Sequence, residues 1–240
     1  MQIITQKSDI KELISECTRA YDLSGIAACS KELESQILSK KVKFPLLEFC
    51  GNELYQKIKI EEQIDLCDKI ERLKKEGGNV ILGIILQKRL DINFEQSIDK
   101  ATEYISKADM WYVCDIIGER VYGYSLLKNP DKTIPHIKIL SNHSTNWVVR
   151  ALGAGIHYAI KKGLNKYNVE LIFPILLSMA NTRDKEIKQG VGWAAKTTAK
   201  FHPKIIEQFD KEIQDQDNVA NWFRTKISIG LYRNKYAKGN

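Results

Sequence analysis

The first residues whose types could do chemistry are a tryptophan and an aspartate in the stretch ADMWYVCDIIGERV, residues 108–121. Their i, i+4 spacing places Trp111 and Asp115 on one face of a helix. Apolar residues surround the aspartate, and a carboxylate is costly to bury unless it is paired. Partly buried carboxylates that face a cleft are common catalytic groups. The alternative is a packed tryptophan beside an aspartate that is hydrogen-bonded to a neighbouring helix.

An arginine in the stretch SNHSTNWVVRALGAGIHYAIKKG is the second candidate. A helix is predicted to begin near Thr145, which places Arg150 in its second turn. The start of a helix together with a guanidinium fork makes a good phosphate site. The alternative for Arg150 is a structural salt bridge.

The third candidate is a small-residue surface around Trp193, in the stretch IKQGVGWAAKTTAKFHP, residues 187–203. Gly190 and Gly192 lie inside a predicted helix, where each is unfavourable by roughly 0.5–1 kcal/mol relative to alanine. Such a surface lets another backbone come close, either that of a neighbouring helix or that of a DNA strand. The segment is also basic, with Arg183, Lys185, Lys188, Lys196, Lys200 and Lys204.

Several chemistries that need a cofactor or a metal have no motif in this chain. No glycine-rich phosphate loop and no nucleophile elbow is present. The four histidines do not stand at metal-ligand spacings with cysteines or carboxylates. We therefore expect neither a metal nor a nucleotide cofactor. Each histidine is interpreted as an ordinary surface or core residue.

Cysteine usage and hydropathy indicate the compartment. The five cysteines form no C-x-x-C pair, and the N-terminus carries no signal peptide, so a reduced cytoplasm is predicted. No apolar run approaches the roughly 18 residues of a membrane span, so no membrane association is expected.

The net charge of +7 is unevenly distributed. Residues 1–100 hold 16 basic and 17 acidic side chains, whereas residues 101–240 hold 21 and 13. The basic half also contains all four tryptophans. A basic, aromatic half suggests a polyanion partner such as nucleic acid, and the alternative is a solvated surface with many lysines.

The elements that must position these residues are helices, because apolar residues recur with a helical period nearly throughout. Helices are predicted at 9–21, 29–38, 45–57, 61–75, 79–89, 94–107, 109–123, 131–141, 145–162, 169–180, 184–200, 203–214 and 218–234.

Helix boundaries are predicted from capping residues. Pro45, Pro130 and Pro203 stand where a first helical turn should begin. Ser144 and Asp184 are candidate N-caps. The glycines of EGG at 76–78, and Gly163, are placed where helices should end.

The predicted fold is all-α, an α-solenoid or superhelix of about six HEAT-like two-helix repeats. A weak internal sequence similarity between NWVVRAL (146–152) and NWFRTKI (221–227) favours a repeat protein over a helical bundle. No low-complexity linker divides the chain, so a single domain over residues 1–240 is predicted.

Taken together, the three stretches resemble the AlkD-like family of DNA alkylation repair proteins, which are HEAT-repeat DNA glycosylases. The resemblance is carried by Trp111 with Asp115, by NWVVR ending in Arg150, and by VGWAAKTTAKFHP with Trp193. It is clearest over residues 105–210. The order and approximate separations of these motifs match as well.

The resemblance implies hydrolysis of the N-glycosidic bond of cationic alkylated purines, such as 3-methyladenine and 7-methylguanine, in double-stranded DNA. It implies a catalytic site of Asp115, Trp111 and Trp193, with Arg150 on a backbone phosphate. Further DNA contacts are expected, from charge and helical placement, at Lys161, Lys162, Lys188, Lys196 and Arg224. A cytoplasmic monomer that joins the nucleoid when bound to DNA is expected.

Two alternatives to this function stay open. In the first, the chain is a non-catalytic HEAT-repeat protein that binds distorted or branched DNA. Tyr112 and Val149 motivate it, because members of the family often have an aspartate and an arginine at these positions. In the second, the chain is a solenoid scaffold for a protein partner, which would leave the basic half unexplained.

Overall fold

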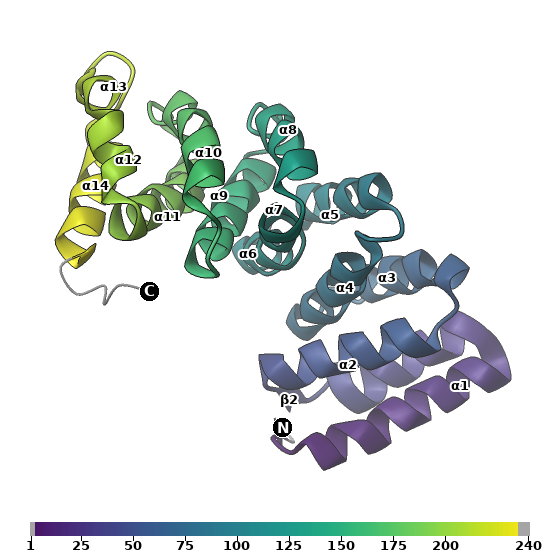
Figure 1. The fold of residues 1–240 in the computed structure, drawn as a ribbon. Coiled ribbons are helices and arrows are strands. Elements are labelled where there is room, and N and C mark those ends of the chain that lie inside the picture. Colours follow the sequence, from purple (N-terminus) through teal and green to yellow (C-terminus); the bar gives the residue numbers. More distant parts are fainter. Residues whose placement is uncertain (1–2, 235–240) are drawn as a thin grey trace. The chain divides into compact units, whose positions relative to one another are not determined.

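The computed structural model describes residues 3–234 and is almost entirely helical (Figure 1). Two strands of two residues each, β1 (Ile3–Ile4) and β2 (Lys41–Val42), pair in parallel. Within the described residues, no helix is both long and apolar enough to pass through a bilayer.

The backbone contacts divide the chain into two compact units, residues 1–104 and 105–240. Each unit is described by itself below. The single domain expected from the sequence stays a prediction.

Unit 1 is built around a helix that is buried on nearly every side. This helix, α4, packs against both α2 and α3, and its residues from Gly78 to Leu86 are all buried. A helix that is apolar all round is typical of one enclosed by others. The elements of unit 1 are α1 (Lys7–Leu33), η1 (Glu34–Leu38), α2 (Phe44–Lys57), η2 (Ile60–Glu62), α3 (Gln63–Arg72), α4 (Glu76–Arg89) and most of α5 (Phe94–Ala108).

Unit 2 consists of two rows of helices. The elements are α6 (Trp111–Ile117), the π-helical η3 (Gly118–Gly123), α7 (Tyr124–Lys128), α8 (Pro130–Leu140), α9 (Asn146–Lys161), α10 (Lys166–Ser178), α11 (Lys185–Phe201), α12 (Pro203–Gln208), α13 (Asp210–Gln214) and α14 (Asn221–Asn234).

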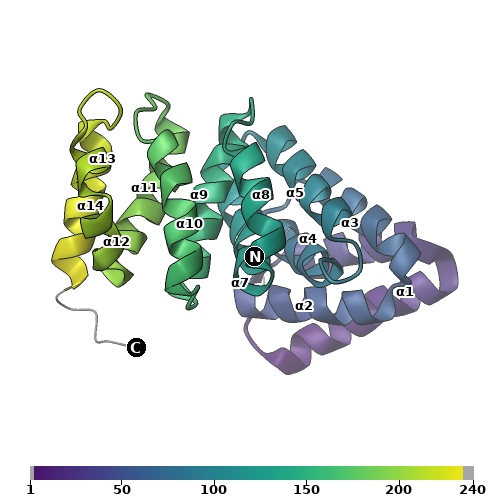
Figure 2. The same ribbon diagram turned by 45° about the horizontal axis from the view of Figure 1, so that its top comes forward.

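In one row, α6 with η3 packs on α9, α9 on α11, and α11 on α14. The other row contains α8, α10 and α12, of which α10 packs against both α8 and α11 (Figures 1 and 2). Successive helix pairs therefore stack on one another, and the fold is all-α and solenoid-like, as the sequence predicts.

The central helices of unit 2 approach closely because their contact surfaces carry glycines. A Cβ added to Gly153 of α9 would lie 2.1 Å from the carbonyl carbon of Gly190 in α11. A real Cβ does not come this close, so only glycine permits this helix packing. Of the two alternatives for the small-residue surface at Gly190, the neighbouring helix is confirmed.

Most of the predicted helix boundaries are confirmed. The three prolines stand in the first turns of α2, α8 and α12. The Asp184 carboxylate caps α11 by accepting hydrogen bonds from the backbone N–H groups of Glu186 and Ile187, both at 2.9 Å. Gly163 follows α9 with a φ of 97°.

Two local predictions are wrong, and a third is confirmed. Residues 76–78 begin α4 instead of ending a helix, because Lys74 adopts the left-handed conformation that the turn requires (φ 52°). Thr145, not Ser144, is the N-cap of α9. The predicted interruption between residues 21 and 29 is confirmed at Gly25, whose backbone is not helical (φ 76°, ψ −168°) and where the two helices of α1 meet at a kink.

All five cysteines are buried free thiols. Burial raises the pKa of Cys29 and of Cys114 to about 12. Because the thiolate is the reactive form, these side chains behave as core residues and not as nucleophiles.

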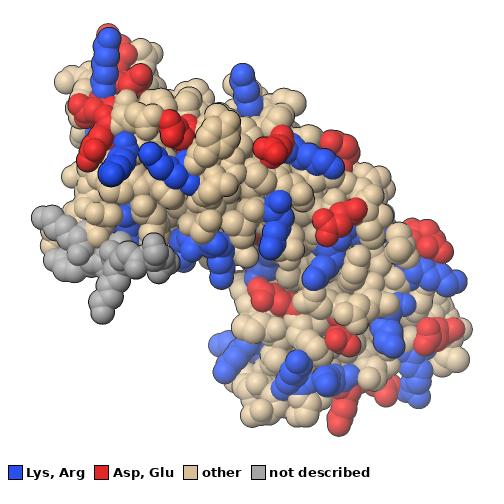
Figure 3. Space-filling model, in the orientation of Figure 1, with Lys and Arg blue, Asp and Glu red and all other residues tan. Residues whose placement is uncertain are grey.

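Charged side chains of both signs are spread over each unit on the face drawn in Figure 3. The basic excess of the second half therefore does not form one uniform field on that face. The residues of a functional site therefore have to be identified from local geometry.

Candidate functional site

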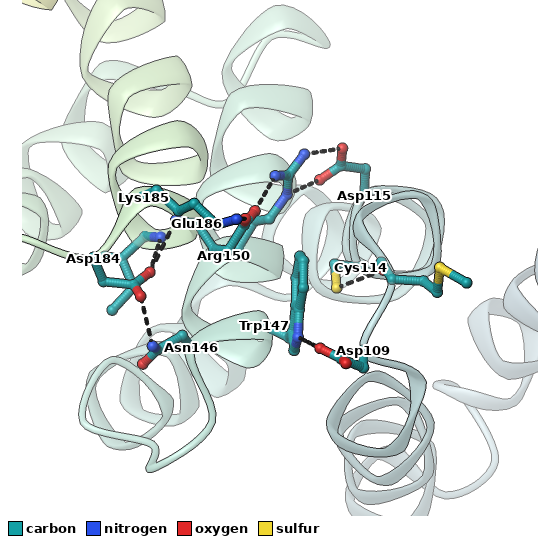
Figure 4. Close-up of polar contacts among 11 residues, drawn as sticks. Asp109, Cys114, Asp115, Asn146, Trp147, Arg150, Asp184, Lys185 and Glu186 are labelled. Carbon is teal, nitrogen blue, oxygen red and sulfur yellow. Dashed lines mark hydrogen bonds and ion pairs between the residues drawn. The ribbon is translucent and has the colours of Figure 1, made fainter.

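The centre of the candidate site is the guanidinium group of Arg150, which bridges two carboxylates from two other helices (Figure 4). Its Nε and Nη2 donate to Oδ1 and Oδ2 of Asp115 at 3.0 and 2.8 Å. Its Nη1 donates to Oε2 of Glu186 at 2.6 Å. Arg150 lies on α9, Asp115 on α6 and Glu186 on α11, so this ion-pair cluster joins three successive helices of one row.

The cluster is largely shielded from solvent but still accessible at its acidic ends. The side chain of Arg150 is 8 % exposed, while those of Asp115 and Glu186 are 13 % and 16 % exposed. Burial lowers the pKa of Arg150, but hydrogen bonds and charge attraction from the two carboxylates outweigh it and raise this pKa above its ordinary value. One cation with two carboxylates leaves a formal negative charge, which favours a cationic group at the exposed carboxylate ends of the cluster.

Two tryptophan rings flank the guanidinium group. The Cζ atom of Arg150 lies 5.9 Å from the ring centroid of Trp147 and 5.4 Å from that of Trp193. Trp147 is held in place by a hydrogen bond from its Nε1 to Oδ1 of Asp109, at 2.7 Å. Asp109 adopts a left-handed backbone conformation (φ 46°) just before α6 begins.

Trp111, in contrast, presents its ring to solvent. It is the first residue of α6 and is 57 % exposed. Such exposure is unusual, because tryptophan side chains are highly buried on average. Its ring meets that of Tyr112 edge-on, with the centroids 5.9 Å apart. One helical turn separates Trp111 from Asp115, so an aromatic face and a carboxylate lie along the same side of α6.

The structure therefore brings Asp115, Arg150 and Trp193 together, with Trp111 one turn from Asp115. The alternatives raised for Asp115 and Arg150, a hydrogen bond to a neighbouring helix and a salt bridge, describe real contacts. Catalysis by Asp115 and phosphate binding by Arg150 stay predictions.

The other predicted DNA contacts belong to α9, α11 and α14 or directly follow α9. Lys161 and Lys162 are exposed at the C-terminal end of α9, while Lys188 and Lys196 are half-buried on α11. Arg224, on α14, donates from Nη1 to the carbonyl oxygen of Val219.

Sequence reasoning missed Glu186, Trp147 and Asp109 as members of the site. A signal for them exists in the repeat spacing. Arg150 contacts residues 35 positions earlier and 36 positions later, and Trp147 contacts a residue 38 positions earlier. A search for polar residues one repeat before and after Arg150 could have found Glu186.

The Asp115 carboxylate is held in one orientation and keeps further acceptor positions. Each of its oxygens accepts one hydrogen bond from Arg150, which fixes the plane of the carboxylate. A carboxylate has about four acceptor positions, so it can still accept a hydrogen bond from a water molecule or contact a cation. Among residues 3–234, no group of three or more histidine, cysteine or carboxylate side chains is placed to hold a metal ion.

Comparison with known proteins identifies one match. The family described as DNA alkylation repair enzyme matches residues 42–224, a range that includes the whole ion-pair cluster. No curated protein and no solved structure matches the chain.

Proposed function

The chain belongs to the family of DNA alkylation repair enzymes, and from this premise we propose that it is a monofunctional DNA glycosylase. Its substrates are cationic alkylated purines, such as 3-methyladenine and 7-methylguanine, in double-stranded DNA. The observation that carries the proposal is the Asp115 carboxylate, which is oriented by Arg150 and remains 13 % exposed at the edge of a site that contains three tryptophans.

The proposed chemistry uses a leaving group that is already charged. Alkylation at N3 or N7 leaves a positive purine, so no general acid is needed to protonate it. The bond between the purine nitrogen and C1′ breaks, and its electron pair stays on the base and neutralises it. Positive charge then spreads over the deoxyribose, and the Asp115 carboxylate stabilises this charge. Water attacks C1′ and loses a proton to Asp115 or to bulk water.

Arg150 has two functions in this proposal. Three of its five N–H groups donate to carboxylates, which orients Asp115. The remaining N–H groups are available to a backbone phosphate of the lesioned strand. Because a phosphate would share the guanidinium group with Asp115 and Glu186, DNA binding and carboxylate orientation are coupled through this residue.

The tryptophans supply π faces to the cationic base or sugar. Such a contact contributes roughly 0.5–2 kcal/mol. Trp111 is the better placed of the two predicted residues, since its ring is more than half exposed, whereas Trp193 already contacts Arg150 and the ring of His157. The duplex on either side is held by the basic residues predicted from charge, Lys161, Lys162, Lys188, Lys196 and Arg224.

The test is mass spectrometry of the bases released from methylated duplex DNA. We expect the wild-type protein to release 7-methylguanine and Asp115→Asn to lose at least 99 % of the rate. The matched control is Glu186→Gln, which removes the other charge partner of Arg150 at a similar burial. We expect it to reduce the rate less than tenfold, since the Asp115 carboxylate remains.

The same experiment can contradict the proposal in two ways. Full activity of Asp115→Asn would exclude the catalytic role of this carboxylate. Equal loss in both variants, with equal loss of thermal stability, would show that Asp115 acts only through the ion-pair cluster.

A second candidate function is shape-selective DNA binding without catalysis. Both oxygens of Asp115 accept hydrogen bonds from Arg150, and a purely structural ion pair would have the same arrangement. This observation favours the second candidate function. Tyr112 and Val149 are consistent with it. It predicts preferential binding to bent or branched DNA and no base release from any alkylated substrate.

A further inference from the structure

A second cluster of cationic and aromatic side chains lies at the far end of α11, and of the residues proposed above to hold the duplex it includes Lys161 and Lys196. Its centre is Phe201, the last residue of α11, which is 39 % exposed. The helical rise places Phe201 roughly 22 Å along α11 from Glu186. The two regions are therefore separate surfaces of the same unit.

Two cavities share Phe201 as a lining residue. One, of about 200 Å³, is also lined by His157 and by the cationic side chains of Lys161, Lys196, Lys200 and Arg233. The other, of about 250 Å³, is lined by Lys166, His202, Pro203 and Lys204. No carboxylate lines either cavity. Their ligand is therefore expected to be an anion.

Burial and neighbouring cations both disfavour a further positive charge at these cavities. Burial together with the charges of Arg233 and Lys226 lowers the pKa of Lys196. Burial together with Lys161 and Lys196 lowers the pKa of His157 to about 4. In the part of the chain that the structure describes, Lys161, Lys200 and Arg233 have no ion-pair partner. An anionic group placed among them would relieve this repulsion.

The exposed ring distinguishes this surface from a simple phosphate site. The ammonium group of Lys200 lies 5.0 Å from the centroid of the Phe201 ring. An aromatic ring flanked by cationic grooves is how proteins bind single-stranded nucleic acid, because an unpaired base stacks on the ring and its phosphates lie in the grooves. Bases inside a duplex are already stacked on one another, so they are not available to stack on the Phe201 ring. The 250 Å³ cavity is below the usual size of drug-sized ligand pockets, which suits a single planar base.

We propose that Phe201 and its two flanking cavities bind unpaired nucleotides of DNA, with one base stacked on the Phe201 ring. Lys161, Lys200 and Arg233 hold phosphate on one side, and Lys166 and Lys204 hold phosphate on the other. This inference rests on the proposed function insofar as it takes DNA as the ligand. It adds a preference for DNA in which a single-stranded segment adjoins the duplex.

The test compares two fluorescently labelled, unmodified DNAs by anisotropy: a blunt duplex, and the same duplex with a single-stranded oligothymidine tail. We expect the wild-type protein to bind the tailed duplex at least about fivefold more tightly, which is the low end of what stacking on one aromatic ring contributes. Phe201→Ala should reduce this preference to less than twofold. Phe201→Tyr, which keeps the ring, should retain it.

The matched control is Phe44→Ala in unit 1, because Phe44 is exposed to nearly the same fraction, 40 %. It should keep the full preference for the tailed duplex. The proposal is overturned if the tail gives the wild-type protein no advantage, if Phe201→Ala keeps the advantage, or if Phe201→Tyr loses it as Phe201→Ala does. Equal weakening of blunt and tailed duplex by Lys200→Ala would identify a duplex-phosphate site and would also overturn it.

Base release from blunt methylated duplex separates this inference from the proposed glycosylase activity. Release without a tail preference removes this inference alone. A Phe201-dependent tail preference without release removes the glycosylase and leaves this inference in place. Absence of binding to both DNAs removes both.

Discussion

The backbones of Arg150 and Gly190 meet so closely that no side chain fits between them. A Cβ on Gly190 would lie 2.2 Å from the carbonyl oxygen of Arg150 and 2.8 Å from its Cα. The contact lies one turn from Glu186, so it sets the spacing between α9 and α11 at the level of the ion-pair cluster. The separation between Arg150 and Glu186 therefore depends on Gly190, which takes no part in the chemistry.

Replacing this glycine should separate the two helices. Gly190→Ala places a methyl group against backbone atoms, which cannot rotate away as a side chain can. We expect destabilisation of about 1–3 kcal/mol or more, as for other overpacked sites. Base release should fall less than tenfold, as in Glu186→Gln, because Arg150 loses Glu186 but keeps Asp115 on α6. Denaturant unfolding and the base-release assay measure the two effects.

Gly192 provides the matched control two residues away in the same helix. A Cβ there would lie 3.2 Å from the side chain of Lys226, which is long and flexible. Gly192→Ala should therefore be neutral, or stabilising by up to about 1 kcal/mol through helix propensity. If Gly190→Ala were as stable as Gly192→Ala, the close helix contact described here would be wrong.

The exposed ring of Trp111 should matter to activity and not to stability. Trp111→Ala removes a side chain that is 57 % exposed, so we expect its thermal unfolding to change little while base release falls at least tenfold. Trp147→Ala should instead destabilise the protein, since it breaks the hydrogen bond to Asp109 and removes a ring beside Arg150. A Trp111→Ala variant with unchanged base release would remove this residue from the proposed site.

His157 should make unfolding depend on pH. Its ring pairs through Nδ1 with Oγ1 of Thr197 at 2.6 Å, and its pKa is about 4 because burial and nearby lysines disfavour the charged form. The unfolded chain takes up this proton near pH 6.5, whereas the folded chain does not until about pH 4. The contribution is therefore complete above pH 6.5 and is lost as the pH falls towards 4, by at most about 2 kcal/mol at pH 5.

Urea unfolding at pH 7 and pH 5 tests this, with His157→Gln as the comparison. The variant should lose less stability between the two pH values than the wild type, even though its stability at pH 7 is lower. His202 is present in both proteins and cancels in the comparison. Identical losses in the two proteins would show that His157 titrates normally in the folded state.

Helices, their ends and the pairing of neighbouring side chains along one helix could be predicted from the sequence because they depend on local interactions. The period of apolar residues located nearly every helix, and Asp184 marked the start of α11 through its capping bonds. The spacing of Trp111 and Asp115 on one face follows from helix geometry alone. The glycines at 77 and 78 misled the same reasoning, since they pack against Leu47 and Ile70 and do not end a helix.

What only the tertiary structure decided is which groups surround Arg150. The sequence identified an arginine at the start of a helix and left open whether it holds a phosphate or forms a salt bridge. Its partners lie 35 and 36 residues away, on helices whose register depends on how their surfaces pack. The contact between Gly190 and Arg150 fixes the approach of α11 to α9, and the contact between Gly118 and Ala151 fixes the approach of η3 to α9. Neither contact can be predicted from one helix alone, because a glycine permits close packing without specifying the partner. The sequence by itself thus determined the helices and the residues able to do chemistry, whereas packing across the repeats decided that Arg150 orients Asp115.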